Sequence, residues 1–207
     1  MIETEILGIP LCFETGGSVF SPGGVDAGTL AMLAEAELKP GDKVLDLGCG
    51  YGPVGLYAAK RLGIGSVVLC DVSEEAVEYA RANAAGNGLP GLDIRRSDGY
   101  SAVPEHDFTL ILSNPPYHTD FSVAKRFIEG GFRRLALGGR MMMVTKRREW
   151  YQNKLAAVFG GVKTLERDGY WVFLAEKRRE GAAPKRPKQP AGLSRKLRRR
   201  QERTKRG

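Results

Sequence analysis

Short apolar segments alternate with helical patterns along most of this chain, and this alternation limits the possible folds more than any other feature. Several segments are rich in Val or Ile, and most are followed within two residues by Gly, Asp, Ser or Asn, as buried parallel strands are. The pattern predicts an α/β fold with a doubly wound sheet, whose ligand binds at the carboxyl ends of the strands. The predicted strands cover residues 43–47, 66–70, 92–95, 108–112 and 140–144.

Helical patterns lie between these strands, and a hairpin follows the last of them. The helix predicted over 74–85 has Ser73 as its N-cap and two acidic residues in its first turn. Asp168 and Gly169 predict a type I′ turn between two antiparallel strands, over 162–167 and 170–176. Near the start of the chain, residues 6–14 are predicted to be extended, and residues 26–37 to form a helix with Asp26 as its N-cap. Further helices are predicted over 53–62, 121–136 and 150–159.

The charge of the chain divides it into two parts. Residues 177–207 carry 14 Lys or Arg against 2 Asp or Glu, whereas residues 1–176 carry 18 against 22, so the net charge of +8 comes from the tail. We predict one domain over 1–176 and a tail that is disordered in isolation, because the tail has few large apolar residues and contains three prolines. Basic segments of this kind often bind nucleic acid; the alternative is a solvated extension that aids solubility.

Some classes of protein do not fit this sequence. The acidic start MIETEILGIP lacks the basic and apolar regions of a signal peptide, and no apolar run reaches the roughly 18 residues that span a bilayer. We therefore expect a cytoplasmic protein. Cys12, Cys49 and Cys70 are far apart and form no CxxC pair, which argues against a disulfide framework and a zinc site. No metal is predicted.

The stretch VLDLGCGYGPVG contains Gly50-x-Gly52-x-x-Gly55, which is the spacing of a dinucleotide fingerprint. Asp71 follows 21 residues after Gly50, where a carboxylate would bind a ribose diol. These two features fit a nicotinamide cofactor, but taken alone they do not decide the ligand. Asp46 discriminates between candidate ligands, because a carboxylate just before the glycines would repel the pyrophosphate of a dinucleotide but attract the ammonium and sulfonium groups of S-adenosylmethionine.

We therefore interpret the glycine loop as the site for the methionine end of S-adenosylmethionine. Its glycines permit positive φ and close approach of the backbone, although they could also simply let a helix start tightly against a strand. Asp71 would accept from both ribose hydroxyls, and Asp98 from the adenine amino group. The predicted cofactor-binding residues of these strand ends are Asp46, Gly48, Gly50, Gly52, Asp71, Val72, Ser97 and Asp98.

The sequence Asn114-Pro115-Pro116-Tyr117 follows the fourth predicted strand. Two prolines fix the backbone, remove two donors and leave carbonyl groups to accept hydrogen bonds. An NH₂ group could donate to the Asn114 side-chain oxygen and to the Pro115 carbonyl, which would turn its lone pair toward the sulfonium methyl. Tyr117 would stack on a planar target. We predict these four residues to be catalytic, with Asn114 also near the cofactor; the alternative is a rigid turn after a strand.

The combination of VLDLGCGYGPVG, LCDVS and SNPPYH, preceded by GSVFSPGGVDAGT, resembles the class I S-adenosylmethionine-dependent methyltransferases of the small-domain family. This family includes bacterial guanine-N2 methyltransferases of small-subunit ribosomal RNA, and the similarity covers about residues 13–176. The resemblance implies a Rossmann-like, seven-stranded, mostly parallel sheet with an antiparallel terminal hairpin. It also implies that residues 1–37 cover the cofactor and substrate, with the pocket lined by Phe20, Ser21, Asp26, Gly28 and Thr29.

The expected reaction is N-methylation of an exocyclic amine of an RNA base, first of all guanine N2 of small-subunit ribosomal RNA. The ribosomal guanine enzymes often have Phe after the two prolines, whereas this chain has Tyr117. A tyrosine at this position fits adenine-N6 and protein glutamine-N5 methyltransferases equally well, so both remain alternatives. A third hypothesis is a non-catalytic module for RNA binding or ribosome assembly. Known two-domain relatives carry an additional N-terminal domain, so the basic tail is expected to supply the RNA affinity here. His118 could contact a substrate phosphate.

Overall fold

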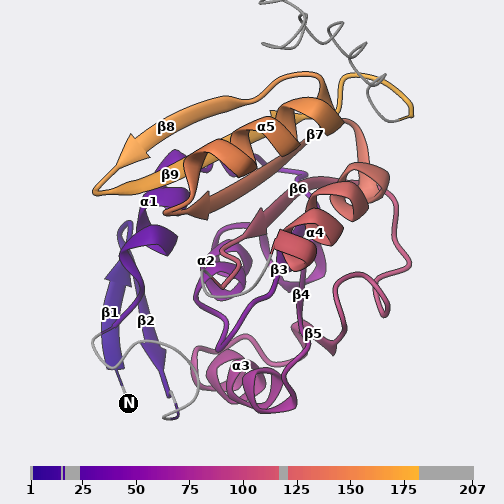
Figure 1. The fold of residues 1–207 in the computed structure, drawn as a ribbon. Helices are drawn as coiled ribbons and strands as arrows, with labels where there is room; N and C mark the ends of the chain where they lie inside the picture. Colours follow the sequence, from indigo (N-terminus) through magenta and orange to yellow (C-terminus); the bar gives the residue numbers. More distant parts are fainter. Residues whose placement is uncertain (1, 15, 17–23, 117–120, 182–207) are drawn as a thin grey trace, which may run out of the picture.

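The computed structural model describes residues 2–14, 16, 24–116 and 121–181, and its main feature is a seven-stranded sheet (Figure 1). The strand order is β5-β4-β3-β6-β7-β9-β8. All neighbouring strands from β5 to β7 are parallel, and β9 is antiparallel to both β7 and β8. The predicted α/β fold is confirmed. The strands are β3 (Val44–Leu47), β4 (Val67–Asp71), β5 (Asp93–Arg96), β6 (Phe108–Ser113), β7 (Leu135–Thr145), β8 (Lys163–Arg167) and β9 (Tyr170–Glu176).

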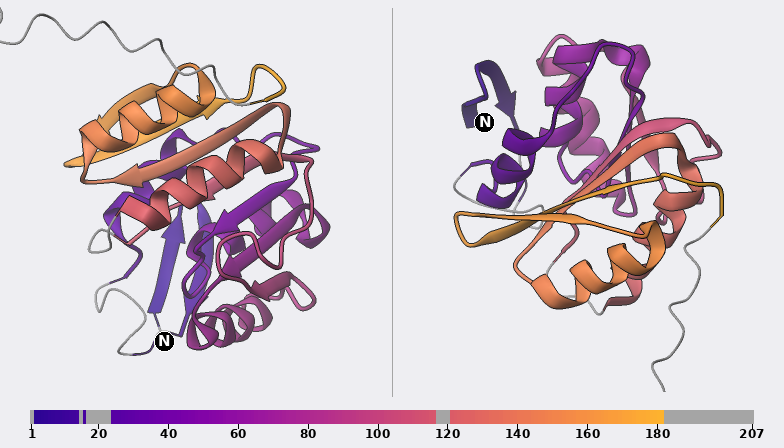
Figure 2. Two further views of the ribbon diagram at one scale, coloured as in Figure 1. Left: turned by 45° about the vertical axis from the view of Figure 1, so that its right-hand side comes forward. Right: turned by 90° about the horizontal axis from the view of Figure 1, so that it is seen from above.

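Helices cover both faces of this sheet (Figure 2). Alternate residues of each strand face opposite sides: Val44 packs with the helices α1 to α3, whereas Leu45 packs with α4 and α5. The chain moves outward from β3 to β4 and β5, then crosses to β6 on the other side of β3. This reversal places a binding site at the carboxyl ends of β3 and β6. The helices are α1 (Ala27–Glu35), α2 (Pro53–Leu62), α3 (Glu74–Gly86), α4 (Phe121–Arg134), α5 (Arg148–Phe159) and the 3-10 helix η1 (Ile64–Ser66).

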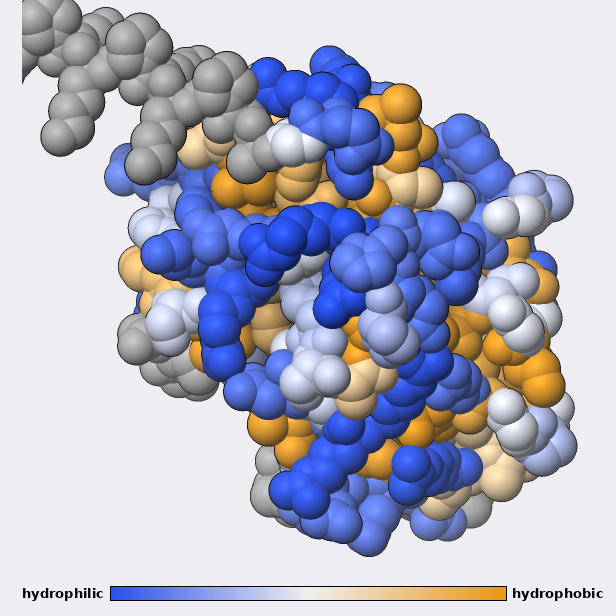
Figure 3. All heavy atoms as spheres, turned by 90° about the vertical axis from the view of Figure 1, so that its right-hand side faces the viewer, coloured by the Kyte–Doolittle hydropathy of each residue, from blue (hydrophilic) through white to orange (hydrophobic). Residues whose placement is uncertain are grey.

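The surface is mostly hydrophilic on the side that lies at the right of Figure 1. Hydrophilic residues run across this face, and hydrophobic ones show between them in smaller groups (Figure 3). No helix within the described residues is long and apolar enough to cross a membrane. The predicted tail is described only as far as Gly181, so the prediction that it is disordered concerns residues outside the described part.

Three predicted elements differ clearly from the structure. The strand predicted over 140–144 is longer, because β7 already begins at buried Leu135, which pairs with Phe108; α4 therefore ends at Arg134 instead of residue 136. The extended segment predicted over 6–14 is part of a separate hairpin, formed by β1 (Ile2–Ile6) and β2 (Ile9–Phe13). Its turn has positive φ at both Leu7 and Gly8, and Leu is a poor sequence marker for that conformation.

Two asparagines of α3 attach this hairpin to the rest of the domain. Asn83 and Asn87 are four residues apart and share one helix face. Asn87 accepts from the Cys12 amide at 2.9 Å and donates to the Cys12 carbonyl at 2.6 Å. Asn83 pairs in the same way with Glu14, at 2.7 and 3.0 Å, and also donates to the Tyr51 carbonyl at 3.0 Å. The β1–β2 hairpin is thus linked to the glycine loop through one buried side chain.

Candidate cofactor and substrate pocket

A pocket of about 560 Å³ lies at the carboxyl ends of β3, β4, β5 and β6. It collects most of the residues predicted from widely separated motifs. Gly28 and Gly52 do not line it, and Phe20, Ser21, Tyr117 and His118 lie outside the described residues. The predicted residues that line the pocket are Asp26, Thr29, Asp46, Gly48, Gly50, Asp71, Val72, Ser97, Asp98, Asn114, Pro115 and Pro116.

The glycine loop joins β3 to α2 through three residues with positive φ. These are Gly48 at 77°, Gly50 at 55° and Gly52 at 100°, the last being the N-cap of α2. Gly55 has another role: a Cβ there would lie 2.3 Å from Leu69 Cγ, so its missing side chain lets α2 pack against β4. The apparent dinucleotide spacing therefore combines turn glycines with a packing glycine, and does not by itself specify the ligand.

Asp46 is buried in β3 beneath this loop, with 2% of its surface exposed. Its Oδ2 accepts from the Gly55 amide at 2.8 Å, which supplies the first turn of α2 with an acceptor that Gly52 cannot provide. A dinucleotide pyrophosphate would need amides at this same helix terminus. The structure therefore places a carboxylate where a phosphate would otherwise bind, which supports the electrostatic argument made from the sequence.

The protonation of Asp46 is sensitive to its surroundings. Burial raises the pKa of Asp46 from 3.8 to about 7, the hydrogen bond from Gly55 opposes this shift, and the negative charge of Asp71 adds to it. A cationic group in the pocket would favour the ionised form and lower this pKa. Burial, with the charges of Asp46 and Asp71, also raises the pKa of the Cys49 thiol well above its ordinary value, which makes Cys49 a poor nucleophile.

Asp71 ends β4 with both carboxylate oxygens oriented by backbone amides. Oδ2 accepts from Gly50 and Oδ1 from Ser73, each at 2.9 Å. An ionised carboxylate has about four acceptor positions, so two such bonds leave capacity for a diol. The arrangement is well suited to the predicted binding of ribose hydroxyls.

The two residues predicted near adenine are placed differently from Asp71. Asp98 is exposed at the pocket rim, where its Oδ2 accepts from Arg126 at 3.1 Å. The Ser97 hydroxyl donates to the Gly99 carbonyl and accepts from the Ala102 amide, both at 2.9 Å. Ser97 therefore uses its side chain to shape the loop after β5. The role of Asp98 toward adenine stays a prediction.

Asn114 follows β6 directly and is fixed by residues from the start of α1. Its Nδ2 donates to Asp26 Oδ2 at 2.6 Å and to Thr29 Oγ1 at 3.0 Å. Both amide hydrogens are thereby directed toward α1, and the predicted role would use the side-chain oxygen as a hydrogen-bond acceptor. Thr29, predicted to bind the cofactor, lines the pocket and accepts from Asn114 through its hydroxyl; its cofactor contact stays a prediction.

Asp26 has a role that the sequence did not indicate. It is the predicted N-cap of α1, confirmed by a 3.0 Å bond from the Thr29 amide to Oδ2. Its other oxygen accepts from the Tyr170 hydroxyl at 3.2 Å. Tyr170 also lies over Gly28, where a Cβ would come within 2.7 Å of the ring. Asp26 therefore connects α1, β9 and the end of β6 beside the pocket. Its hydrogen bond with Asn114 joins residues 88 positions apart in the sequence, so no local pattern could predict it.

The donor groups of the described residues do not form a metal centre. No group of three or more His, Cys, Asp or Glu side chains is arranged there to hold a metal ion, and the three cysteines are free. The pocket chemistry that the structure presents is that of carboxylates, loop amides and one oriented carboxamide.

The strand order, the reversed final hairpin and a pocket above the β3 glycine loop together define a class I methyltransferase fold. The sequence profile for the methyltransferase small domain matches residues 10–174, and the chain belongs to this family. The resemblance seen in its motifs is thereby confirmed.

Relatives and solved structures agree with this assignment. The ribosomal RNA small subunit methyltransferase C of Pseudomonas aeruginosa is 31% identical over 180 residues, which cover 84% of this chain and 52% of that protein. The protein of the same name from Klebsiella pneumoniae is 36% identical over 163 residues, covering 77% and 47%. The Thermus thermophilus 16S rRNA N2 methyltransferase RsmC, solved with AdoMet and guanosine, has a TM-score of 0.77 and 31% identity, covering 86% and 50%. The chain spans about half the length of these relatives.

Proposed function

We propose that this protein is an S-adenosylmethionine-dependent N-methyltransferase that modifies guanine N2 of small-subunit ribosomal RNA in the cytoplasm. The observation that carries the proposal is the orientation of Asn114 by Asp26 and Thr29 in the lining of the pocket. The relatives named as small-subunit ribosomal RNA methyltransferases, and the neighbour solved with AdoMet and guanosine, support the choice of cofactor and base.

The pocket residues fit S-adenosylmethionine better than a phosphate-bearing cofactor. Asp71, held by two amides, would bind the ribose hydroxyls, and Asp46 would face positive charge from beneath the glycine loop. Gly48 and Gly50 would allow close approach of the backbone. When bound, S-adenosylmethionine would supply an activated methyl group. Predicted contacts from Phe20, Ser21, Val72 and Asp98 remain part of this proposal.

Asn114 and Pro115 would hold the amine to be methylated. The Asn114 oxygen and the Pro115 carbonyl would each accept one N–H, so that the nitrogen lone pair points at the methyl carbon. As the new N–C bond forms, positive charge grows on nitrogen, and both acceptors stabilise it. The amine loses its proton after transfer, so no general base is required. Pro116 would keep this segment rigid, and Tyr117 would stack on the base.

Methyl transfer to defined acceptors tests this function. Radiolabelled S-adenosylmethionine is supplied with undermethylated small ribosomal subunits, free ribosomal RNA or total protein, and the labelled product is identified after digestion. We expect label in N2-methylguanosine. Label in N6-methyladenosine or in glutamine would contradict the proposed substrate but keep the mechanism. If S-adenosylmethionine binds and no acceptor is labelled, the chain is a binding module instead of an enzyme.

The basic tail is proposed to contact RNA phosphates. Deleting residues 182–207, which carry 11 cations against 1 acid, keeps the buried Lys177 in place; it should weaken the binding of small-subunit RNA and make log Kd less dependent on log salt. We expect a loss of at least about tenfold near 150 mM salt, since several phosphate contacts disappear. S-adenosylmethionine affinity, measured by calorimetry, should stay unchanged. Equal RNA affinity and equal salt dependence in the two proteins would contradict a role for the tail in RNA binding.

A further inference from the structure

A row of cationic and aromatic side chains continues the sheet edge that holds Asn114. We call it the basic-aromatic strip and define it as Lys146, Arg147, Arg148, Arg167, Tyr170 and Trp171. The strand register places these residues at one edge: Ser113 pairs with Met143, Thr145 pairs with Trp171, and Arg167 pairs with Tyr170. The strip therefore follows the carboxyl end of β7 and the turn between β8 and β9. The strands β6, β7, β9 and β8 are neighbours in this order, and three spacings of roughly 4.8 Å between them make this edge about 14 Å wide.

The cations of the strip lie over aromatic rings. Lys146 Nζ is 4.9 Å from the centre of the Tyr170 ring, and Arg148 Cζ is 4.3 Å from that of Trp171. Arg147 Cζ lies 5.2 Å from the ring of Phe121, at the start of α4. All three cations are exposed. Exposed cations packed on aromatic faces can bind phosphates and also offer planar surfaces to bases.

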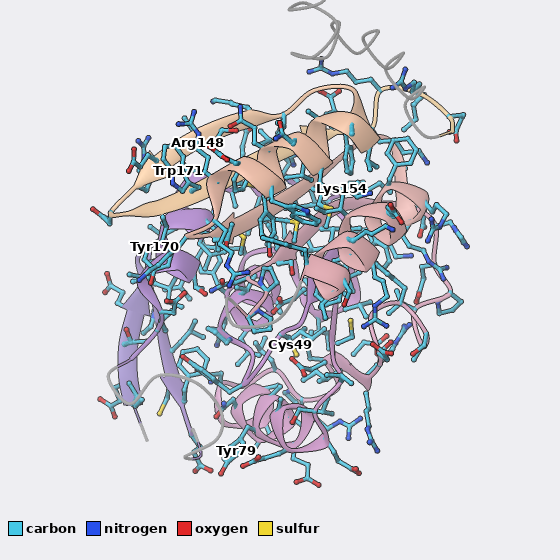
Figure 4. The ribbon with its side chains drawn as sticks, viewed as in Figure 1. Cys49, Tyr79, Arg148, Lys154, Tyr170 and Trp171 are labelled. Carbon is cyan, nitrogen blue, oxygen red and sulfur yellow. The ribbon has the colours of Figure 1, made fainter. Side chains whose placement is uncertain are left out.

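Three cations of the strip are consecutive in the sequence. They form the only run of three consecutive cations within residues 1–176, a region in which acidic residues exceed basic ones by 22 to 18. Lys146 and Arg148 form no ion pair within the described residues, whereas Arg167 of the strip is paired with Glu35 at 2.7 Å. Lys154, further along α5, is paired with Glu129. Figure 4 shows Arg148, Trp171 and Tyr170 together at one end of the β8–β9 hairpin, away from Lys154.

Hydrogen bonds connect the strip to the residue that would hold the target amine. Tyr170 donates to Asp26 at 3.2 Å, and Asp26 accepts from Asn114 at 2.6 Å. A nucleotide whose base reaches Asn114 would therefore have its chain neighbours beside the strip. By contrast, β9 ends at Glu176 opposite Arg140, so the tail leaves the described domain from the other edge of the sheet. The strip, and not the origin of the tail, adjoins the pocket.

We propose that the basic-aromatic strip binds the single-stranded RNA that flanks the methylated nucleotide, with its cations on phosphates and its planar groups against bases. This inference rests on the proposed function. Recognition of single-stranded RNA commonly combines aromatic or guanidinium stacking with a basic track along the backbone. The strip supplies both along the edge where the target base would enter.

A triple variant with a charge-matched control tests the proposal in the full-length chain. The variant carries Lys146→Ala, Arg147→Ala and Arg148→Ala; the control carries Lys60→Ala, Arg61→Ala and Lys163→Ala, which are exposed positions away from the carboxyl edge. We expect the variant to bind undermethylated small-subunit RNA about tenfold more weakly, with a salt slope lower by about two, at roughly 0.7 per phosphate contact. The control should stay within about twofold of the unmodified protein. Thermal unfolding and S-adenosylmethionine affinity should be equal in all three proteins.

The outcomes separate this inference from the function on which it rests. If the unmodified protein methylates RNA and the variant binds that RNA as the control does, the strip is not the binding surface, and the proposed function stands. If the unmodified protein neither binds nor methylates RNA, both proposals are wrong. If RNA is excluded and an acidic protein is bound through the same three cations, the strip serves a protein partner and the RNA assignment fails.

Tryptophan fluorescence tests independently whether RNA bases approach the aromatic residues of the strip. The chain has two tryptophans, so Trp150→Phe leaves Trp171 as the single tryptophan. Trp150 stacks on Phe121 with ring centres 4.4 Å apart, and phenylalanine preserves an aromatic partner there. Small-subunit RNA should quench Trp171 emission in proportion to the bound fraction. Unchanged emission at saturating RNA would show that no base approaches Trp171.

Discussion

Asn114→Ala should lower kcat for methyl transfer by about a thousandfold, in the range found when one oriented group that stabilises a transition state is removed. The expected loss is large because the Asn114 oxygen would both aim the amine and stabilise the charge that grows on it. The affinity for S-adenosylmethionine should change by less than about tenfold, since Asp46 and Asp71 remain. Single-turnover methyl transfer and calorimetry measure the two quantities separately. Full transfer with normal cofactor binding would remove Asn114 from the mechanism.

The partners of Asn114 provide a matched pair of variants for the same prediction. Thr29→Val keeps the shape of the side chain but removes the hydroxyl that accepts from Nδ2 at 3.0 Å; Thr29→Ser keeps that hydroxyl. We expect kcat to fall about tenfold in the valine variant, from one buried hydrogen bond worth about 1.4 kcal/mol, and to stay near normal in the serine variant. KM for S-adenosylmethionine should not follow this pattern. Equal kcat in both variants would show that the orientation of Asn114 does not depend on Thr29.

S-adenosylmethionine should bind more tightly as the pH rises toward 7, by up to about tenfold per pH unit, and the gain should level off above the pKa of Asp46. The pKa of Asp46 is about 7 in the free protein, so Asp46 is protonated below that pH. Binding of a cationic cofactor favours the carboxylate, and the proton must be released when the complex forms below pH 7. Calorimetry from pH 5.5 to 8.5, in buffers of different ionisation enthalpy, measures affinity and proton release together.

The free protein should show the opposite trend in stability. Because the folded pKa of Asp46 lies above the value of 3.8 for an ordinary aspartate, the unfolded state loses this proton first. The contribution of Asp46 to the free energy of unfolding therefore falls as the pH rises from about 4 to about 7. Asp46→Asn should remove both pH dependences and weaken cofactor binding, whereas Asp98→Asn, at an exposed position, should leave both in place. A pH-independent affinity in the unmodified protein would show that Asp46 does not face the charge of the cofactor.

The sequence was sufficient to predict most of the sheet, because its buried strands and amphipathic helices have different periods and clear end signals. The Asp168–Gly169 turn located the antiparallel hairpin, as the positive φ values of both residues confirm. The β1–β2 hairpin was missed because Leu7 adopts a conformation that its residue type rarely marks. Local signals reach only a few residues along the chain, so they describe single elements better than their partners.

The same limit applies to the pocket. Motifs at the strand ends identified Asp46, Asp71 and Asn114 as candidates, since parallel strands bring their carboxyl ends to one edge. The bonds from Asn114 to Asp26 and Thr29 depend on how α1 packs beside β6, which no local pattern encodes. Likewise, nothing in the sequence showed that the Ser97 hydroxyl is used within its own loop.

The hydrogen bonds of Asn83 couple the stability of the β1–β2 hairpin to that of the glycine loop after β3. The buried amide of Asn83 bonds both Glu14 and Tyr51, so a movement of this side chain would break the link to the hairpin and the link to the loop that follows β3 together. The two segments would then open and close as one cooperative unit, although Figure 1 shows the hairpin apart from the main sheet. A ligand that holds the loop closed would accordingly slow amide hydrogen exchange at Glu14, which follows β2 and does not line the pocket.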